Sequence, residues 1–455
     1  MKIKLPENAK KILDTIHEAG FEAYVVGGCV RDAILGREPG DWDITTNALP
    51  RDVKRLFKRT IDTGIEHGTV TVMFGKEGYE VTTYRIDGKY EDNRHPSEVT
   101  FTASLTEDMK RRDFTINAMA YNEEEGLIDR FGGIRDIEEG LIRCVGEPKE
   151  RLLEDALRIM RAVRFSAQLG YTIEEKTKLA IKELAPTLKN ISAERIQVEL
   201  VKLLLSDHPE EMRTAYELGI TKVILPEFDE CMTTEQNNIH HAYNVGEHII
   251  RSMMHVRSDR VLRLTMLMHD IGKPATLTVD NQGVSHFKGH EKIGADMSTA
   301  IFRRLKFDKK TMDSVYNLIL HHDERFPATA KNVKRAMNRV GVSEYPSLLE
   351  VKRADTLAQS MYKREEKLAY IDELERLYNE IIENHECVIL SHLAVNGRDL
   401  MERGIAPGKV IGEVLKRMLD DVIEQPEHNT REYLLGPEHL KAFMRCDSEN
   451  EDENK

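Results

Sequence analysis

The sequence predicts a multidomain α+β protein in which a mixed sheet with helices is followed by a long all-helical part. The chain has 455 residues, more than one hydrophobic core organises, so two to four domains are expected. Segments with alternating apolar and β-branched residues occur before residue 149, whereas later apolar residues recur at helical spacing. This change of pattern places the first domain at 1–148.

Composition limits the classes of function. No apolar run approaches the roughly 18 residues that cross a bilayer, and the N-terminus lacks an apolar signal-peptide core, so we expect a cytoplasmic protein without membrane contact. The five cysteines are scattered, which predicts neither a disulfide framework nor a thiolate zinc site. The net charge of −13 argues against a protein that coats nucleic acid over its whole surface, but it allows local basic patches.

A turn near the N-terminus has the composition of a phosphate site. An apolar strand signal at 23–26 is followed by Gly27 and Gly28, and then by a helix with Arg31 in its first turns. Glycines let backbone N–H groups approach an anion closely, and a helix N-terminus favours phosphate. The alternative is an ordinary turn between a strand and a helix.

A pair of carboxylates follows this turn. Asp41 and Asp43 are one residue apart, so in an extended segment both point to one face and suit a hard cation. Two alternating segments at 68–74 and 79–85 predict a hairpin, and Glu80 within it is a candidate third carboxylate. The alternatives are an acidic loop for the pair and a solvent-facing side chain for Glu80.

Other elements of the first domain frame this stretch. Residues 10–19 and 50–57 have helical spacing, and the polar, turn-rich segment at 87–96 predicts a mobile surface loop. Arg112 ends a run of three basic residues immediately before an apolar segment. We expect it to point into the phosphate site, although such a run is more often a solvated face.

Two strong helix signals, at 151–169 and 193–205, open the helical part. The first carries charged residues at every third position: Asp155, Arg158, Arg161 and Arg164. Residues at this spacing are neighbours on a helix surface, and the ordinary reading is a salt-bridged face. Apolar residues crowd around the row, however, so part of it should be buried, and a polar ligand is then a reasonable partner.

Six motifs occur in order over about two hundred residues: Gly-Gly-x-Val-Arg-Asp at 27–32, Asp-x-Asp at 41–43, Arg-Arg-Asp-Phe-Thr-Ile-Asn-Ala at 111–118, Gly-Gly-x-x-Asp at 132–136, Glu-Asp-x-x-Arg at 154–158 and Glu-Arg-x-x-x-Glu-Leu at 194–200. The set resembles the bacterial class II CCA-adding tRNA nucleotidyltransferases and their relatives, the bacterial poly(A) polymerases. The resemblance implies a polymerase-beta-like nucleotidyltransferase head on a helical molecule. The expected parts are a head at 1–148, a neck at 149–215, an HD-type body at 216–365 and a tail at 366–455.

The resemblance also implies residue roles in the head. Asp41 and Asp43 would hold two Mg²⁺ ions, one activating the tRNA 3′-hydroxyl and the other stabilising the leaving pyrophosphate. The triphosphate would be held by Gly27, Gly28, Arg31 and Arg112.

Asp155 and Arg158 match the base-reading pair of the family. Cytosine and adenine both offer an exocyclic amino donor beside a ring-nitrogen acceptor, whereas uracil and guanine offer the reverse. A carboxylate one helical turn from a guanidinium therefore accepts C and A and rejects U and G. Arg161 and Arg164 would support this pair, or contact the triphosphate and the primer.

The implied partners are the tRNA 3′ end, ATP and CTP. Residues 67–72 are similar to the CCA-adding branch, and no basic Arg-Arg-Phe segment typical of bacterial poly(A) polymerases is found. The loop around residues 94–96 resembles the flexible loop of CCA-adding and A-adding enzymes. A-addition alone, polyadenylation, and an HD phosphohydrolase with an RNA-recognising head remain alternatives, and the oligomeric state is open.

A second group of metal-binding residue types lies in the C-terminal half: His241, His269, Asp270, His290, His321, His322 and Asp355. A His-Asp pair after the apolar run at 262–268 is similar to the ligand set of HD phosphohydrolases. It implies one or two divalent metals, including transition metals, and hydrolysis of phosphate esters. The alternative is an HD fold kept only as a tRNA-binding body. Residues 366–443 are predicted to be helical with a break at 404–408, and 447–455 to be disordered.

Overall fold

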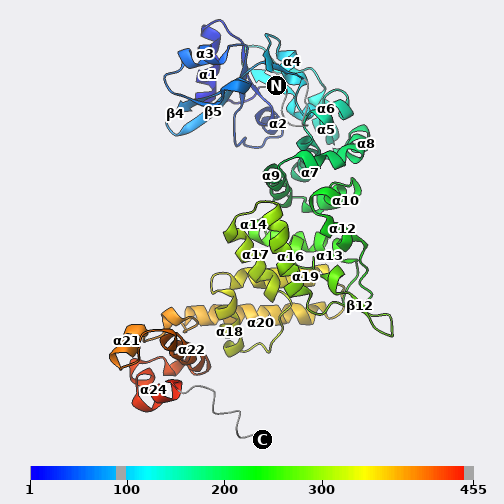
Figure 1. Cartoon of the computed structure of the whole chain (residues 1–455). Coiled ribbons are helices and arrows are strands. Elements are labelled where there is room, and N and C mark those ends of the chain that lie inside the picture. Colours follow the sequence, from blue (N-terminus) through cyan, green and yellow to red (C-terminus); the bar gives the residue numbers. More distant parts are fainter. Residues whose placement is uncertain (1, 89–98, 445–455) are drawn as a thin grey trace. The chain divides into compact units, whose positions relative to one another are not determined.

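The computed structural model describes residues 2–88 and 99–444 (Figure 1). The chain forms two compact units, and each is described by itself: Met1–Thr233 with Ile301–Phe307, and Thr234–Ala300 with Asp308–Lys455. Residues 89–96 of the predicted loop and the acidic end at 447–455 lie outside the described residues. The division into head, neck, body and tail at 148, 215 and 365 stays a prediction.

A seven-stranded sheet forms the centre of the first unit, in the order β3-β4-β5-β2-β1-β8-β9. Its strands are β1 (Ala23–Val26), β2 (Ile44–Thr46), β3 (Thr60–Gly64), β4 (Thr69–Phe74), β5 (Glu77–Thr83), β8 (Met119–Asn122) and β9 (Gly126–Asp129). The neighbouring strands run antiparallel except β2 and β5, which are parallel. The predicted strand and hairpin are confirmed as β1 and as β4 with β5.

Helices and short strand pairs surround this sheet. The helices are α1 (Glu7–Glu18), α2 (Gly28–Ile34), α3 (Pro50–Leu56), α4 (Leu105–Lys110) and α5 (Gly133–Glu139). The strand pairs are β6 (Arg85–Asp87) with β7 (Val99–Phe101), and β10 (Leu141–Ile142) with β11 (Thr172–Ile173). The central strands β1 and β2 are buried along their whole length, whereas the edge strand β3 is mostly exposed. The buried core is therefore centred on β1 and β2, the strands that flank the predicted site at 27–43.

The rest of this unit is helical: α6 (Pro148–Glu154), α7 (Leu157–Leu169), α8 (Glu175–Leu184), α9 (Ala193–Leu204), α10 (Met212–Glu217), α11 (Thr221–Ile224) and α12 (Pro226–Thr233). The prediction of one helix over 151–169 is wrong, because the chain is extended at Asp155, with φ −139° and ψ 103°. The Asp155 carboxylate accepts the N–H of Leu157 at 3.0 Å. This contact satisfies an orphan donor at the start of α7 and favours a new helix over continuation of α6.

The second unit is formed almost entirely by helices: α13 (Val245–Met253), α14 (Arg260–Met268), α15 (Lys273–Thr276), α16 (His290–Arg304), α17 (Lys309–His321), α18 (Ala330–Val340), α19 (Tyr345–Ala358), α20 (Arg364–Glu383), α21 (Gly397–Glu402), α22 (Lys409–Glu424), α23 (Arg431–Leu434) and α24 (Pro437–Met444). Its β12 (Thr278–Val279) and β13 (Ser285–His286) were not predicted. α14 packs against α13, α17 and α19, which buries the predicted apolar run. Residues 404–408 separate α21 from α22, as predicted. Within the described ranges, none of the helices has the length and apolarity to span a membrane.

Gly272 brings two segments of the second unit into backbone contact. A Cβ atom at this position would lie 2.5 Å from the carbonyl oxygen of His290 and 2.6 Å from the backbone nitrogen of Gly294. Neither distance is possible for a real side chain. Gly272 therefore permits the close packing of the segment after α14 against the first turn of α16.

We predict that Gly272→Ala lowers the free energy of unfolding by about 1–3 kcal/mol, because the added methyl group forces packed backbone apart. Denaturant unfolding followed by circular dichroism measures the change. Gly412→Ala in α22 is the matched control, since a Cβ there meets no atom within 4 Å. Unchanged stability of the Gly272 variant would contradict the packing argument.

Candidate functional site

Three carboxylates meet at the centre of the head sheet. Asp41 and Asp43 lie directly before β2, and Glu80 is in β5. Because β2 and β5 are parallel with Ile44 opposite Val81, Asp43 is brought beside Glu80, one residue earlier on each strand. The register of this strand pair therefore gathers residues that are widely separated in the sequence.

The proximity of these carboxylates is visible in their electrostatics. Burial raises the pKa of Asp43, and Asp41 adds to the rise while Arg112 opposes it. Burial also raises the pKa of Glu80, and the charges of Asp43 and Asp41 raise it further. Anionic groups that lie close enough to repel one another are stabilised by a divalent cation, and the exposure of these three residues leaves the site open to one. The donor set fits a hard metal such as Mg²⁺.

The glycine turn beside this cluster has two arginine side chains near it. Gly27 has a φ of +87°, and a Cβ atom on it would lie 3.0 Å from Arg112 Nη1. A Cβ on Gly28 would lie 3.7 Å from Arg31 Nη2. Arg31 is itself held by a 2.7 Å hydrogen bond to Asn117. The absence of side chains at the turn leaves the backbone and both guanidinium groups close together, which is the arrangement that binds polyphosphate.

Arg112 retains hydrogen-bonding capacity. Its Nη2 atom lies 3.5 Å from the buried carboxylate of Asp108, and its buried Nε atom has no hydrogen-bond partner among the described residues. A buried donor without a partner is costly, so an anionic ligand at this position would satisfy it.

Asp155 lies at the break between α6 and α7, Arg158 lies in the first turn of α7, and each has another ionic partner. Arg195 Nη2 donates to Asp155 at 2.8 Å. Arg158 Nη1 donates to Glu154 at 2.5 Å. The base-reading role of this pair stays a prediction. Arg195 belongs to a motif found in the sequence, but no role was predicted for it.

Arg161 and Arg164 form ion pairs with buried carboxylates. Arg161 donates twice to Asp113, at 2.8 and 2.5 Å, and Arg164 donates to Glu199 at 2.5 Å. Although burial opposes ionisation, Arg161 holds the pKa of Asp113 well below its usual range. The Arg164 guanidinium also lies 3.7 Å from the centre of the Phe165 ring. The two roles that the resemblance implied for these arginines, support of the base-reading pair or contact with the triphosphate and the primer, stay predictions.

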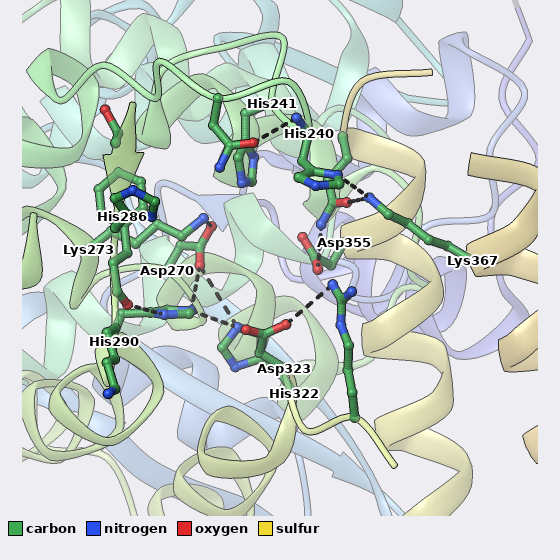
Figure 2. Close-up of a pocket in the computed structure, with 16 residues that line it drawn as sticks. His240, His241, Asp270, Lys273, His286, His290, His322, Asp323, Asp355 and Lys367 are labelled. Atoms are coloured by element: carbon green, nitrogen blue, oxygen red, sulfur yellow. Dashed lines mark hydrogen bonds and ion pairs between the residues drawn. The ribbon is translucent and has the colours of Figure 1, made fainter. Parts of the chain in front are cut away.

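The second unit contains two overlapping groups of metal-ligand types: His248, His269 and Asp270 in the first, and Asp270, His290 and His322 in the second. Within each group the ligand atoms lie within 4.8 Å of one another. Asp270 belongs to both groups, and Figure 2 shows it beside His290 and His322 of the second. Asp355 adds a carboxylate oxygen 2.9 Å from His248 Nε2. Two cations sharing Asp270 fit this donor set.

Backbone carbonyl groups orient these histidines. Three Nδ1 atoms bond to the carbonyl oxygen three residues earlier: His269 to Met266 at 2.8 Å, His290 to Phe287 at 2.9 Å and His322 to Ile319 at 2.7 Å. An Nδ1–H that donates to a carbonyl leaves the Nε2 lone pair free for a metal. In all three residues Nε2 faces Asp270.

The protonation states of His269 and Asp270 also suit metal binding. Burial lowers the pKa of His269 to about 4, so the ring is neutral at pH 7. Although burial opposes it, Lys273 holds the pKa of Asp270 well below its usual range. Lys273 Nζ lies 2.7 Å from Asp270 and donates to Gln236 at 2.8 Å. The cluster opens into a cavity of about 330 Å³.

Three family models match the chain: the poly(A) polymerase head domain at 23–143, the probable RNA and SrmB-binding site of polymerase A at 170–232, and the HD domain at 238–377. A CCA-adding enzyme of Lactiplantibacillus plantarum is 36% identical over 447 residues, which are 97% of this chain and 97% of that protein. The chain belongs to the CCA-adding enzyme family.

Further relatives agree with this assignment. The crystal structure of the Bacillus stearothermophilus CCA-adding enzyme in complex with CTP is 30% identical, with a TM-score of 0.71, and the match covers 95% of this chain and 98% of that chain. A CCA-adding enzyme of Limosilactobacillus reuteri is 54% identical over 213 residues, which are 46% of this chain and 53% of that protein.

Family membership confirms the predicted fold and enzyme class. The chain is a tRNA nucleotidyltransferase with a nucleotidyltransferase head and a helical HD region. The alternatives of an HD hydrolase with a head that only recognises RNA, or of an A-adding or polyadenylating enzyme, are not favoured, because the relative matched over its full length is a CCA-adding enzyme.

The structure changes the predicted HD ligand set. His248 belongs to the cluster and was not predicted. His241 is outside both ligand groups, with its ring 5.6 Å from that of His248, and burial lowers its pKa to about 3. His321 is also outside, because its Nδ1 atom lies 3.5 Å from Glu324. His248 stands alone in an amphipathic helix, so the sequence carries no signal that separates it from an ordinary polar residue.

The repulsion among the head carboxylates predicts an unusual effect of Asp41→Asn. Because the pKa values of Asp43 and Glu80 are raised in the folded protein, the free energy of unfolding falls as pH rises through the carboxyl range. Removing one charge should therefore raise the midpoint of thermal unfolding of the metal-free protein at pH 7, and the gain should vanish below about pH 4, where carboxyl groups are protonated. Mg²⁺ should stabilise the wild type and not the variant.

Calorimetry with and without Mg²⁺ checks this prediction. Asp207→Asn, at an exposed position in the same unit, is the control and should show neither effect. A variant less stable than the wild type at pH 7 without metal would contradict the repulsion argument.

Proposed function

We propose that this enzyme builds and repairs the 3′-terminal CCA of tRNA from CTP and ATP, without a nucleic-acid template. The observation that carries the proposal is the group of Asp41, Asp43 and Glu80 beside a glycine turn with two arginines. The full-length CCA-adding relative and the CTP complex of another relative support it. Work in the cytoplasm, and Mg²⁺ as the metal, are parts of the same proposal.

In the head, each residue has a role in one displacement at phosphorus. Mg²⁺ held by Asp41 and Asp43, with Glu80 beside them, would supply the positive charge that favours attack of the tRNA 3′-oxygen and departure of pyrophosphate. The 3′-hydroxyl gives its proton to solvent as its oxygen bonds to the α-phosphorus, and the bond from that phosphorus to the oxygen bridging to the β-phosphorus breaks, which releases pyrophosphate. Arg31 and Arg112 hold the triphosphate in line at the glycine turn.

Base choice is assigned to Asp155 and Arg158. The carboxylate accepts from the exocyclic amino group of C or A, and the guanidinium donates to the adjacent ring nitrogen. Arg195 is bonded to Asp155, so it fixes the orientation of that carboxylate. One pair thereby serves CTP and ATP.

Single-nucleotide incorporation tests the reaction. The protein is incubated with Mg²⁺, one labelled nucleotide at a time, and tRNA ending before C, CA or CCA. Addition of two C and then one A supports the proposal. Addition of A alone, or of a long A tail, would overturn it.

Asp155→Ala should relax base choice. Uracil and guanine offer no amino donor to the Asp155 carboxylate, and removing this carboxylate removes that penalty. A misplaced hydrogen-bonding edge costs about 1–3 kcal/mol, so discrimination against UTP should fall by roughly 5-fold to 150-fold. The measurement is the ratio of kcat/KM for CTP and UTP, with Asp207→Ala as a surface control. Unchanged discrimination would remove this role from Asp155.

We also propose a second activity, the metal-dependent hydrolysis of phosphate esters. It is assigned to the HD cluster, which consists of His248, His269, Asp270, His290 and His322. The observation that favours it is the pair of overlapping ligand groups that share Asp270, each with inward-facing imidazole Nε2 atoms. Divalent metals at this cluster would polarise a phosphate and lower the pKa of a water molecule. Lys273 adds a buried positive charge beside Asp270 that suits a phosphate oxygen.

The two activities should separate by mutation. Asp41→Ala should reduce CCA addition at least about a hundred-fold, since metal stabilisation contributes several kcal/mol, and it should leave phosphate-ester hydrolysis intact. Asp270→Asn should do the opposite. Both activities are measured on each variant, and loss of both in either one would contradict two independent sites.

A further inference from the structure

Lys352 is a buried cation close to the HD cluster. It lies in α19 and is 8% exposed. Its Nζ atom donates two hydrogen bonds, to the backbone carbonyl oxygens of His322 and Glu324, each at 2.7 Å. Burying an ammonium group is costly unless its hydrogen bonds are satisfied. The two carbonyl oxygens therefore stabilise the cation where it lies, and the cation in turn holds the backbone at 322–324.

This stretch of backbone carries a ligand of the second metal group, which consists of Asp270, His290 and His322. His322 Nε2 lies 3.3 Å from His290 Nε2 and 3.8 Å from Asp270. The 2.7 Å hydrogen bond between His322 Nδ1 and the carbonyl oxygen of Ile319 sets the orientation of the ring. The position of the whole residue depends on its backbone, and the carbonyl group that Lys352 binds is that of His322 itself.

The same helix serves the first metal group, which consists of His248, His269 and Asp270. Asp355 is three residues after Lys352 in α19, so the two side chains are neighbours on the helix surface. The Asp355 carboxylate lies 2.9 Å from His248 Nε2. α19 also packs against α13, α14 and α17. One helix thus contacts the two groups through different side chains, the first through Asp355 and the second through Lys352.

We propose that Lys352 is a positioning residue for the second metal group, and that it acts through the backbone of His322. Its two hydrogen bonds hold His322 at the distance from Asp270 and His290 that a shared cation requires. Because these bonds reach only the second group, loss of Lys352 should weaken cation binding there and not at the first group. This inference rests on the metal binding of the proposed hydrolase.

A purely structural role for Lys352 makes a different prediction. A lysine that only ties α19 to the end of α17 would, when removed, lower the free energy of unfolding and loosen α19 as a whole. Asp355 is on this helix, so the first metal group would be weakened together with the second. Two metal affinities measured separately therefore distinguish a positioning role from a structural one.

Titration of the full chain with Co²⁺ gives these two affinities, because Co²⁺ bound by imidazole groups absorbs visible light. Two backgrounds separate the groups: His248→Ala removes a ligand of the first group, and His290→Ala removes a ligand of the second. Lys352→Met keeps the length of the side chain without the donor. It should raise the Kd of Co²⁺ by roughly 10-fold to 100-fold in the His248→Ala background, and it should leave the Kd unchanged in the His290→Ala background.

Lys310→Met is the matched control, since it removes the same charge from an exposed position of α17, and it should change neither Kd. Should Lys352→Met fail to fold, Lys352→Gln keeps an uncharged donor, and a smaller loss confined to the second group is expected. An equal rise of Kd in both backgrounds, or no rise in either, would overturn the positioning role. Co²⁺ binding without ester hydrolysis would contradict the hydrolase proposal alone, whereas a wild type that binds no Co²⁺ would overturn both.

Discussion

The parallel pairing of β2 with β5 is the constraint on which the head site depends. It brings Asp43 beside Glu80 at the surface of the sheet, where partial desolvation and the neighbouring like charges raise the pKa of both carboxyl groups. The backbone bonds of the central sheet hold these carboxylates together against their repulsion. Because the sheet limits the relaxation of these carboxylates, their arrangement suits a cation, and Arg112 beside them suits a phosphate.

Carbonyl groups at the ends of two helices orient histidine ligands of the HD cluster. His269 and His322 directly follow α14 and α17, so the carbonyl groups in the last turn of each helix lie within reach of their rings. Each imidazole Nδ1–H satisfies one such carbonyl and thereby directs Nε2 inward. A single hydrogen bond thus completes the helix and sets the tautomer of the ligand, while the close backbone approach at Gly272 holds His290 near them.

Local chemistry explains which features the sequence could predict. The strand at 23–26, the hairpin and the α+β division follow from apolar periodicity. The glycine turn could be predicted because turns often need a positive φ, as at Gly27, and glycine adopts it without strain. The break at Asp155 was missed because its side chain competes with the helix through a local hydrogen bond that periodicity does not detect. The choice of His248 over His241 or His321 depends on which ring packs against Asp270, and tertiary packing decides that.

The contacts of α7 connect the proposed base-reading residues with the proposed phosphate-binding residue Arg112. Arg158 donates to the carbonyl oxygen of Arg111 at 2.9 Å, and Arg161 donates to the Asp113 carboxylate. Arg111 and Asp113 are the chain neighbours of Arg112, so α7 holds the chain on both sides of the Arg112 guanidinium. Breaking a buried ion pair leaves an uncompensated charge, which keeps this connection intact. Base reading at the start of α7, as proposed, would then take place at a distance from Arg112 that these contacts fix.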